Sequence, residues 1–431
     1  MFYTPLKYLA RIALGTNFKK IQFSNLEKLP MDKPVLLVTN HPTAFIEPCI
    51  FGSYLDRPVN FIVRGDLFKK PMYAKLMRDI HMIPIFRASE GYDNLKNNYG
   101  TFEYCHDLLK DGQLIQILAE ASTAQVKRAR PLKKGTARMA FGALEKHGRD
   151  QDIKLVPCGI NYTAADEFRS DVIISFGDAI NIQDYLEEYD ENQAKAIRAL
   201  TWQLEEEMKK VIIHVNEDHE EVYEFLFEMD RNDHLQPIFP IYDENGKARF
   251  EREFHIADQL NKSTPEQLAD ITSEVLKYKK SCKAHEVTDF GVRRSKFGDW
   301  SNILILALGL VPFLIGRIGC FIPIFLANRL GVQKVKQREF VASVKLAAGI
   351  GFSFVYYLLL IILAFFFTPW QILLLVLLLP ILGYFSIVYQ EFYRHFREAR
   401  KFLSLNESEQ QELQDLRNGL VPTYAISKSN S

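Results

Sequence analysis

The stretch "VLLVTNHPTAFIEP" at residues 35–48 carries the clearest signals for both fold and chemistry. Its first five residues form a short apolar run, which is typical of a buried strand. His41 follows the run, and the carboxylate of Glu47 comes six residues later. An imidazole presented at the end of a strand, with a carboxylate to orient it, is how proteins make a general base near neutral pH. The stretch therefore predicts a strand that presents a candidate base, His41, and its orienting acid, Glu47.

Around this stretch, residues 33–180 alternate short apolar runs with helical patterns. The runs that predict strands are "VLLVT" (35–39), "NFIVR" (60–64), "MIPIF" (82–86), "QLIQILA" (113–119), "IKLVPCGINY" (153–162) and "DVIISFG" (171–177). Helices are expected between them at 66–80, 92–110 and 135–147. Such alternation predicts an α/β fold with a largely parallel sheet flanked by helices, and a site at the strand ends.

The C-terminal part of the chain has a different composition. No charged residue lies between Lys345 and Glu391, a stretch twice as long as the roughly 20 residues that one helix needs to cross a bilayer. The "TPW" at 368–370 supplies a break and an interfacial Trp, which predicts a hairpin of two spans over 346–390. The equally apolar 302–330 is interrupted by Arg317 and by Gly and Pro, which favours a re-entrant or bent segment.

Basic residues flank the predicted hairpin on both sides, so both of its ends are expected in the cytoplasm. Near the N-terminus, Phe2, Leu6, Leu9 and Ala13 share one helical face, which predicts an interfacial amphipathic helix. We expect an integral membrane protein whose catalytic domain lies on the cytoplasmic face. The predicted organisation is an N-terminal interfacial helix (1–29), a catalytic domain (30–184), a helical insert or connector (185–300), membrane-embedded helices (301–392) and a polar cytosolic tail (393–431).

Composition excludes several other classes of function. Lys plus Arg equals Asp plus Glu, 53 each, so no global charge favours a nucleic-acid partner. The five cysteines are scattered without the paired spacing of a structural zinc site. The chain has neither a phosphate-binding loop nor a Gly-x-Ser-x-Gly elbow, and no His-Glu-x-x-His metal motif. Neither a metal nor a prosthetic group is expected.

Three further segments fit the chemistry of His41 and Glu47. In "IPIFRASEG" (83–91), Arg87 leaves a strand; in "VPCGINY" (156–162), a strand holds Pro157 near its centre. Between them, "QILAEASTAQVKRARPLKKGTARMAF" (116–141) has a strand that ends at Glu120, then a basic cluster that includes Arg128, Lys133 and Lys134, then Gly135 at the start of a helix.

The order of these four blocks resembles the phospholipid and glycerol acyltransferase family, which includes glycerol-3-phosphate and 1-acylglycerol-3-phosphate O-acyltransferases. The resemblance covers roughly residues 30–180. The family pairs its His with an Asp, usually across four residues and across five in some branches that acylate glycerol-3-phosphate, whereas this chain has Glu47 across five. The family's Phe-Pro-Glu-Gly is here Leu-Ala-Glu-Ala, so Ala121 adds a β-carbon where the family has glycine.

The resemblance implies transfer of a fatty acyl group from acyl-CoA or acyl-carrier protein to glycerol-3-phosphate or 1-acylglycerol-3-phosphate in phospholipid synthesis. His41 would act as general base and Glu47 would orient it. The implied substrate-binding residues are Arg87, Glu120, Arg128, Lys133 and Lys134. Partners would be membrane lipids, the glycerol-phosphate acceptor and the acyl donor. The alternative is a catalytically weak, membrane-tethered lipid-binding or scaffold protein with the same fold.

Overall fold

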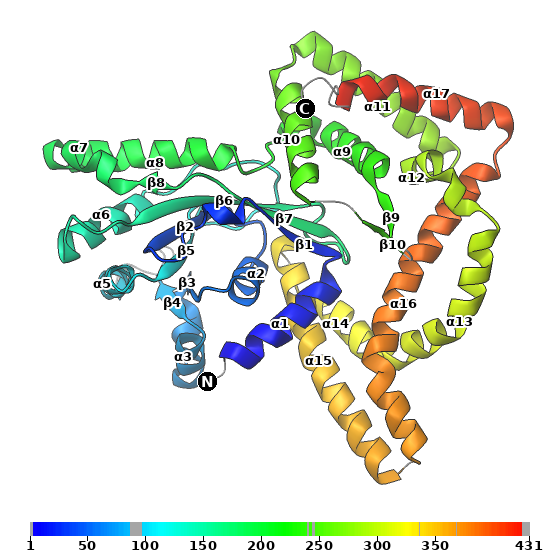
Figure 1. Cartoon of the computed structure of the whole chain (residues 1–431), viewed down its shortest axis with the longest axis horizontal. Helices are drawn as coiled ribbons and strands as arrows, with labels where there is room; N and C mark the ends of the chain where they lie inside the picture. Colours follow the sequence, from blue (N-terminus) through cyan, green and yellow to red (C-terminus); the bar gives the residue numbers. More distant parts are fainter. Residues whose placement is uncertain are drawn as a thin grey trace. The chain divides into compact units, whose positions relative to one another are not determined.

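The computed structural model describes residues 3–86, 97–238, 241–243, 246–335, 337–367 and 369–424 of the chain (Figure 1). Arg87 and the start of the helix predicted at 92–110 lie outside these residues. The chain divides into two compact units, which are described separately. The first unit comprises residues 1–213 and 331–346, and the second comprises residues 214–330 and 347–431. The domain boundaries proposed from the sequence stay predictions.

The first unit is built on a mixed sheet with strand order β1-β7-β6-β2-β5-β3-β4, and β8 pairs with β6. Its strands are β1 (Lys20–Ser24), β2 (Val35–Thr39), β3 (Val59–Arg64), β4 (Met82–Ile85), β5 (Leu114–Leu118), β6 (Lys154–Tyr162), β7 (Asp171–Phe176) and β8 (Ile180–Asn181). The neighbouring strands from β6 through β2, β5 and β3 to β4 are all parallel, whereas β7 and β8 run antiparallel to β6. The largely parallel sheet predicted from the sequence is confirmed.

Helices cover both faces of this sheet, which explains why all five residues of β2 are buried. The helices of the first unit are α1 (Tyr3–Asn17), α2 (Ile46–Tyr54), α3 (Pro71–Asp79), α5 (Asn97–Lys110), α6 (Gly135–His147), α7 (Leu186–Glu191) and α8 (Gln193–Lys209). Leu36 and Val38 join the core under α5, α6 and α8, while α2 and α1 lie on the other side (Figure 1). The sequence patterns did not predict α2, β1 or β8.

Helix α1 directs its two cations inward. Lys7 Nζ donates to the carbonyl of Leu55 (2.7 Å), and Arg11 Nε donates to that of Ser53 (2.6 Å). These carbonyls close the C-terminus of α2, where cations are favoured by the helix dipole. The exposed apolar residues of α1, which include Leu9 and Ile12, therefore face away from the sheet.

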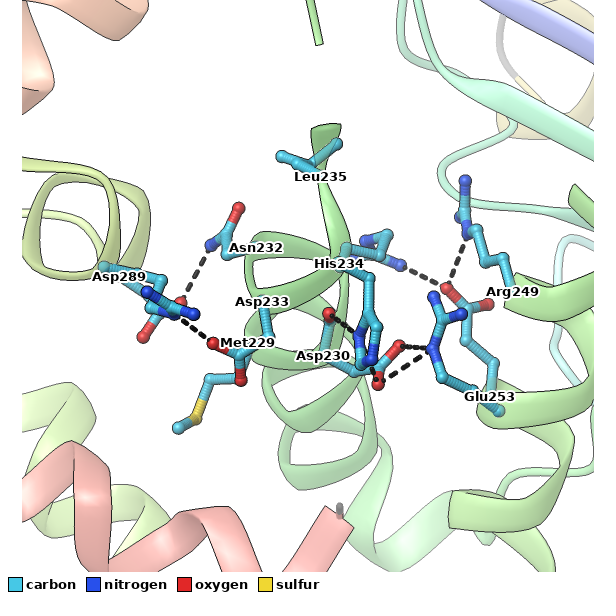
Figure 2. Close-up of polar contacts among 12 residues, drawn as sticks. Met229, Asp230, Asn232, Asp233, His234, Leu235, Arg249, Glu253 and Asp289 are labelled. Atoms are coloured by element: carbon cyan, nitrogen blue, oxygen red, sulfur yellow. Dashed lines mark hydrogen bonds and ion pairs between the residues drawn. The ribbon is translucent and has the colours of Figure 1, made fainter. Parts of the chain in front are cut away.

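The second unit is helical, and a buried polar network holds several of its helices together. Its helices are α9 (Glu220–His234), α10 (Gly246–Lys262), α11 (Pro265–Ala284), α12 (Asp289–Arg293), α13 (Ser301–Gly319), α14 (Phe321–Lys334), α15 (Arg338–Phe367), α16 (Trp370–Leu403) and α17 (Glu407–Tyr424); α14 and α15 each contribute one end to the first unit. A short hairpin pairs β9 (Gln236–Ile238) with β10 (Ile241–Asp243). The buried carboxylate of Asp289 accepts hydrogen bonds from Arg417 (2.8 Å) and Tyr278 (2.9 Å). It also accepts one from Asn232 (2.8 Å) (Figure 2). Because every bond in this network joins different helices, it fixes α9, α11, α12 and α17 to one another.

Three helices among the described residues are long and apolar enough to cross a membrane: Ser301–Gly319, Arg338–Phe367 and Trp370–Leu403. The break predicted at 368–370 falls between α15 and α16. The segment predicted as bent, 302–330, forms two helices that meet at Cys320. In α13, a β-carbon on Gly316 would come within 2.0 Å of the carbonyl oxygen of Leu382, so glycine allows α13 and α16 to pack backbone to backbone.

Candidate active site

His41 and Glu47 face each other at the carboxyl edge of the parallel sheet. His41 follows β2 and Glu47 lies in the first turn of α2, and the side chains are 7% and 0% exposed. His41 Nδ1 lies 3.8 Å from Glu47 Oε2, about 1 Å longer than a normal hydrogen bond. Neither atom has a hydrogen-bond partner among the described residues. Catalytic hydrogen bonds are often long in ligand-free enzymes and tighten when substrate binds.

The other oxygen of Glu47 is held by Thr43. Both the N–H and the hydroxyl of Thr43 donate to Glu47 Oε1, each at 2.7 Å. These bonds fix the carboxylate so that its remaining oxygen points at the imidazole. Tyr162, at the end of β6, is buried close by; burial, and next the charge of Glu47, raise the pKa of its phenol well above the ordinary value. The phenol therefore stays protonated at every working pH.

A second carboxylate, Glu120, holds the main chain of His41. The N–H of His41 donates to Glu120 Oε2 (3.1 Å), and the carbonyl of His41 accepts from the N–H of Ala124 (3.1 Å). Glu120 is 5% exposed and also forms an ion pair with Arg130, whose guanidinium bonds the hydroxyl and the carbonyl of Ser122. Glu120 and Arg130 therefore fix the position of His41 from the loop that follows the neighbouring strand β5.

Two local features of the backbone support this arrangement. Ala121 adopts a φ of 60°, the left-handed conformation that glycine adopts without strain. The side chain of Asn40 bonds both the N–H and the carbonyl of Ile160, at 2.8 and 3.0 Å, and so extends the pairing of β2 with β6. In β6, a β-carbon on Gly159 would come within 1.9 Å of the carbonyl oxygen of Val211, so only glycine fits there.

The loop after His41 also contacts the start of α15, within the first unit. The N–H of Ala44 donates to the carbonyl of Glu339 (3.3 Å). Nearby, Arg338 Nε donates to Asp166 Oδ2 (2.7 Å) and holds the pKa of that carboxyl below its ordinary value. A helix apolar enough to cross a membrane thus begins beside the loop that carries the candidate base.

The structure brings His41, Glu47 and Glu120 together. Lys133 and Lys134 lie at the start of α6 with exposed side chains, and the N–H of Lys133 bonds the carbonyl of Ala119 at the end of β5. Arg128 lies half-buried in the loop between β5 and α6, and Arg87 lies outside the described residues. No group of three His, Cys, Asp or Glu side chains that could hold a metal occurs in the part of the chain that the structure describes.

Sequence reasoning missed Thr43 and Arg130 as parts of this site. Thr43 lies inside the quoted stretch, in the loop that precedes α2 and four residues before Glu47. Arg130 lies within the basic cluster that follows Glu120 in the segment 116–141. Nothing in the sequence distinguished it from the cations around it.

Residues 20–161 match the family model described as Acyltransferase. They therefore form an acyltransferase domain, in agreement with the resemblance of the four sequence blocks to the phospholipid and glycerol acyltransferases. The domain runs from β1 to the next-to-last residue of β6 and contains His41, Thr43, Glu47, Glu120 and Arg130.

Two curated fungal proteins are similar to a larger part of the chain. "Glycerol-3-phosphate O-acyltransferase 1" of Saccharomyces cerevisiae is 25% identical over 279 residues, which cover 58% of this chain and 35% of the yeast protein. An uncharacterized acyltransferase of Schizosaccharomyces pombe is 24% identical over 276 residues, or 58% of this chain and 39% of that protein. The chain thus spans little more than a third of the length of these relatives.

Among solved structures, the 1-acyl-sn-glycerophosphate acyltransferase of Thermotoga maritima is 14% identical, with a TM-score of 0.35 over 48% of this chain and 79% of that chain.

Proposed function

We propose that the first unit transfers a fatty acyl group to the hydroxyl of a glycerol phosphate, with glycerol-3-phosphate as the first acceptor and 1-acylglycerol-3-phosphate as the alternative. The donor is a thioester, acyl-CoA or acyl-carrier protein. One observation carries the proposal. In a domain of this family, the buried imidazole of His41 faces a carboxylate, Glu47, that Thr43 holds in place. The five residues between His41 and Glu47, and the similarity to the yeast glycerol-3-phosphate O-acyltransferase, favour glycerol-3-phosphate.

His41 Nε2 removes the proton of the acceptor hydroxyl as that oxygen attacks the thioester carbonyl. Glu47 keeps the other ring nitrogen protonated and stabilises the imidazolium that forms. The tetrahedral intermediate then collapses, the thiolate leaves, and the proton on His41 passes to it. General-base help of this kind contributes about 10² to 10⁴ in rate, so positioning of both substrates must supply the rest.

The phosphate of the acceptor is bound by exposed cations of the predicted set. Lys133 and Lys134 support this role, since both side chains are exposed and both lie at the N-terminus of α6, where the helix dipole favours anions. Glu120 contributes by holding the main chain of His41, because Arg130 and that main chain already occupy its oxygens. Arg87 stays a predicted phosphate ligand.

The apolar helices α13, α15 and α16 support membrane association, with the acyl chains partitioning into the bilayer. The cytoplasmic orientation of the catalytic unit is part of the proposal and rests on the basic flanks of the hairpin.

The test is an acyl-transfer assay on the full chain in lipid nanodiscs, with each acceptor and each donor in turn. His41→Ala should lower turnover by a factor of about 10² to 10⁴, and His255→Ala, a matched histidine change in α10 of the second unit, should leave it unchanged. Equal product from His41→Ala and the unaltered chain would eliminate the proposal and favour the lipid-binding alternative. The acceptor that gives the higher kcat/KM settles which acylation step the protein performs.

A further inference from the structure

The segment Gly65–Asp79, which we call the α3 surface, presents both apolar and basic side chains to solvent. It consists of the short 3-10 helix η2 (Gly65–Phe68) and α3. Leu67, Met72 and Leu76 are 46, 73 and 40% exposed. Met72 and Leu76 are four residues apart, so they lie on the same side of α3.

The charge of the α3 surface is positive. It carries four basic residues, Lys69, Lys70, Lys75 and Arg78, all exposed, against two acidic ones. One of these two, Asp66, forms an ion pair with Arg64 at 2.7 Å. Apolar side chains beside cations are the composition of protein segments that lie in the headgroup layer of a membrane.

The α3 surface lies at the same edge of the sheet as the candidate base. Strands β2, β5 and β3 are parallel, so η2 leaves β3 at the edge where His41 leaves β2. At its other end, α3 adjoins α1, because the ring of Tyr3 packs edge-on against His81 (5.1 Å between centroids). The N-terminal end of α1 and the C-terminal end of α3 therefore lie side by side (Figure 1).

We propose that the α3 surface docks on an anionic lipid bilayer, with Leu67, Met72 and Leu76 among the acyl chains and the cations among the headgroups. Two observations favour a bilayer over a protein partner. The charge is complementary to anionic lipid, and the head of α15, a helix apolar enough to cross a membrane, contacts the loop after His41 within the same unit. Docking would bring the bilayer to the edge where lipid substrates must enter. The surface is distinct from the residues that hold the acceptor phosphate.

The experiment measures the depth of α3 in the bilayer, with the full chain in nanodiscs. An environment-sensitive fluorophore is attached at Met72→Cys and, as the matched control, at Ala194→Cys, an exposed position at the start of α8 beside the acidic α7. Signal from the native cysteines is subtracted with the unaltered chain. Lipids with spin-labelled acyl chains serve as quenchers, in phosphatidylcholine alone and with added phosphatidylserine.

The fluorophore at position 72 should be quenched and blue-shifted, more so with phosphatidylserine, while the one at position 194 should not respond. Charge reversal by Lys75→Glu and Arg78→Glu should weaken docking at least fivefold for each basic residue that is removed. Equal quenching at 72 and 194 in both lipids would overturn the proposal. So would quenching that ignores phosphatidylserine and charge reversal, or a blue shift without quenching by the spin-labelled lipids, which indicates a protein contact. The readout does not use acyl transfer, so it stands or falls separately from the proposed function.

Discussion

Replacing Glu47 with Gln tests the pairing with His41 while preserving the shape of the site. The Oε1 of Gln can still accept both hydrogen bonds from Thr43, so the amide NH₂ takes the place of Oε2 and faces His41 Nδ1. An amide N–H donates, which forces Nδ1 to accept and moves the ring proton to Nε2. Nε2 is the atom that must accept the substrate proton, so the variant holds the base in the wrong tautomer.

The size of the effect follows from the distance between the two side chains. At 3.8 Å and an effective dielectric constant of about 20, an imidazolium and a carboxylate attract each other by about 4 kcal/mol. The variant loses this attraction when the imidazolium forms in the transition state, which lowers kcat by about 10³. The wrong tautomer raises the expected loss toward the roughly 10⁴ seen when the acid of a serine-protease triad becomes an amide.

The assay is steady-state acyl transfer by purified Glu47→Gln in nanodiscs, beside the matched change Glu266→Gln at an exposed position in α11. We expect kcat to fall with KM unchanged, since Glu47 is fully buried behind His41 and Thr43, and the melting temperature to match that of the unaltered chain. A kcat within tenfold of the unaltered chain, in a variant that is folded, would refute the reasoning that Glu47 serves the base.

Three further variants or reagents test the surroundings of this pair. Ala121→Gly should raise stability by about 0.5 kcal/mol, since it removes left-handed strain at a φ of 60°; a lower unfolding midpoint would contradict this. Arg130→Gln should lower the free energy of unfolding by about 1–3 kcal/mol, because it leaves the buried Glu120 without its cation. It should also lower kcat. The control Lys134→Gln should raise KM and leave the unfolding midpoint unchanged. Desolvation, and next the charge of Glu47, raise the pKa of Cys49 to about 12, so only about one thiol in 10⁴ is ionised at pH 8. Peptide mass spectrometry should find Cys49 unmodified by iodoacetamide, and rapid alkylation would contradict the raised pKa.

The parallel sheet could be predicted from the sequence because its central strands are buried on both faces. Such strands appear as continuous apolar runs, and the predicted runs match β2 to β7 within one residue at each end. The short edge strand β1 contains Lys20 and Gln22 and lacks such a run, so periodicity could not find it. Helix α2 was hidden because its first turn contains Pro48 and its apolar residues surround it on several sides.

The candidate site could be predicted only to the level of residue types. The block order singled out His41, Glu47 and Glu120, which the structure brings together. It did not reveal that Glu120 bonds the main chain of His41, because that contact depends on the register between β2 and β5. The same limit applies to Arg130, whose partner is fixed by the path of a loop.

The geometry of the loop at residues 40–47 explains how a Glu can serve where the family has an Asp. The loop is fixed to its surroundings at Asn40 by β6, at His41 by Glu120, and at Ala44 by the start of α15. Within this loop, the side chain of Glu47 is held in place by Thr43, which donates two hydrogen bonds to Oε1. The other oxygen, Oε2, is left to face the imidazole. The distance of 3.8 Å between His41 Nδ1 and Glu47 Oε2 is short enough for a rotation of the imidazole to bring the two atoms within hydrogen-bond range. Since three neighbouring elements hold the loop, the chemistry that we propose depends on the frame around the pair as much as on the identity of its acid.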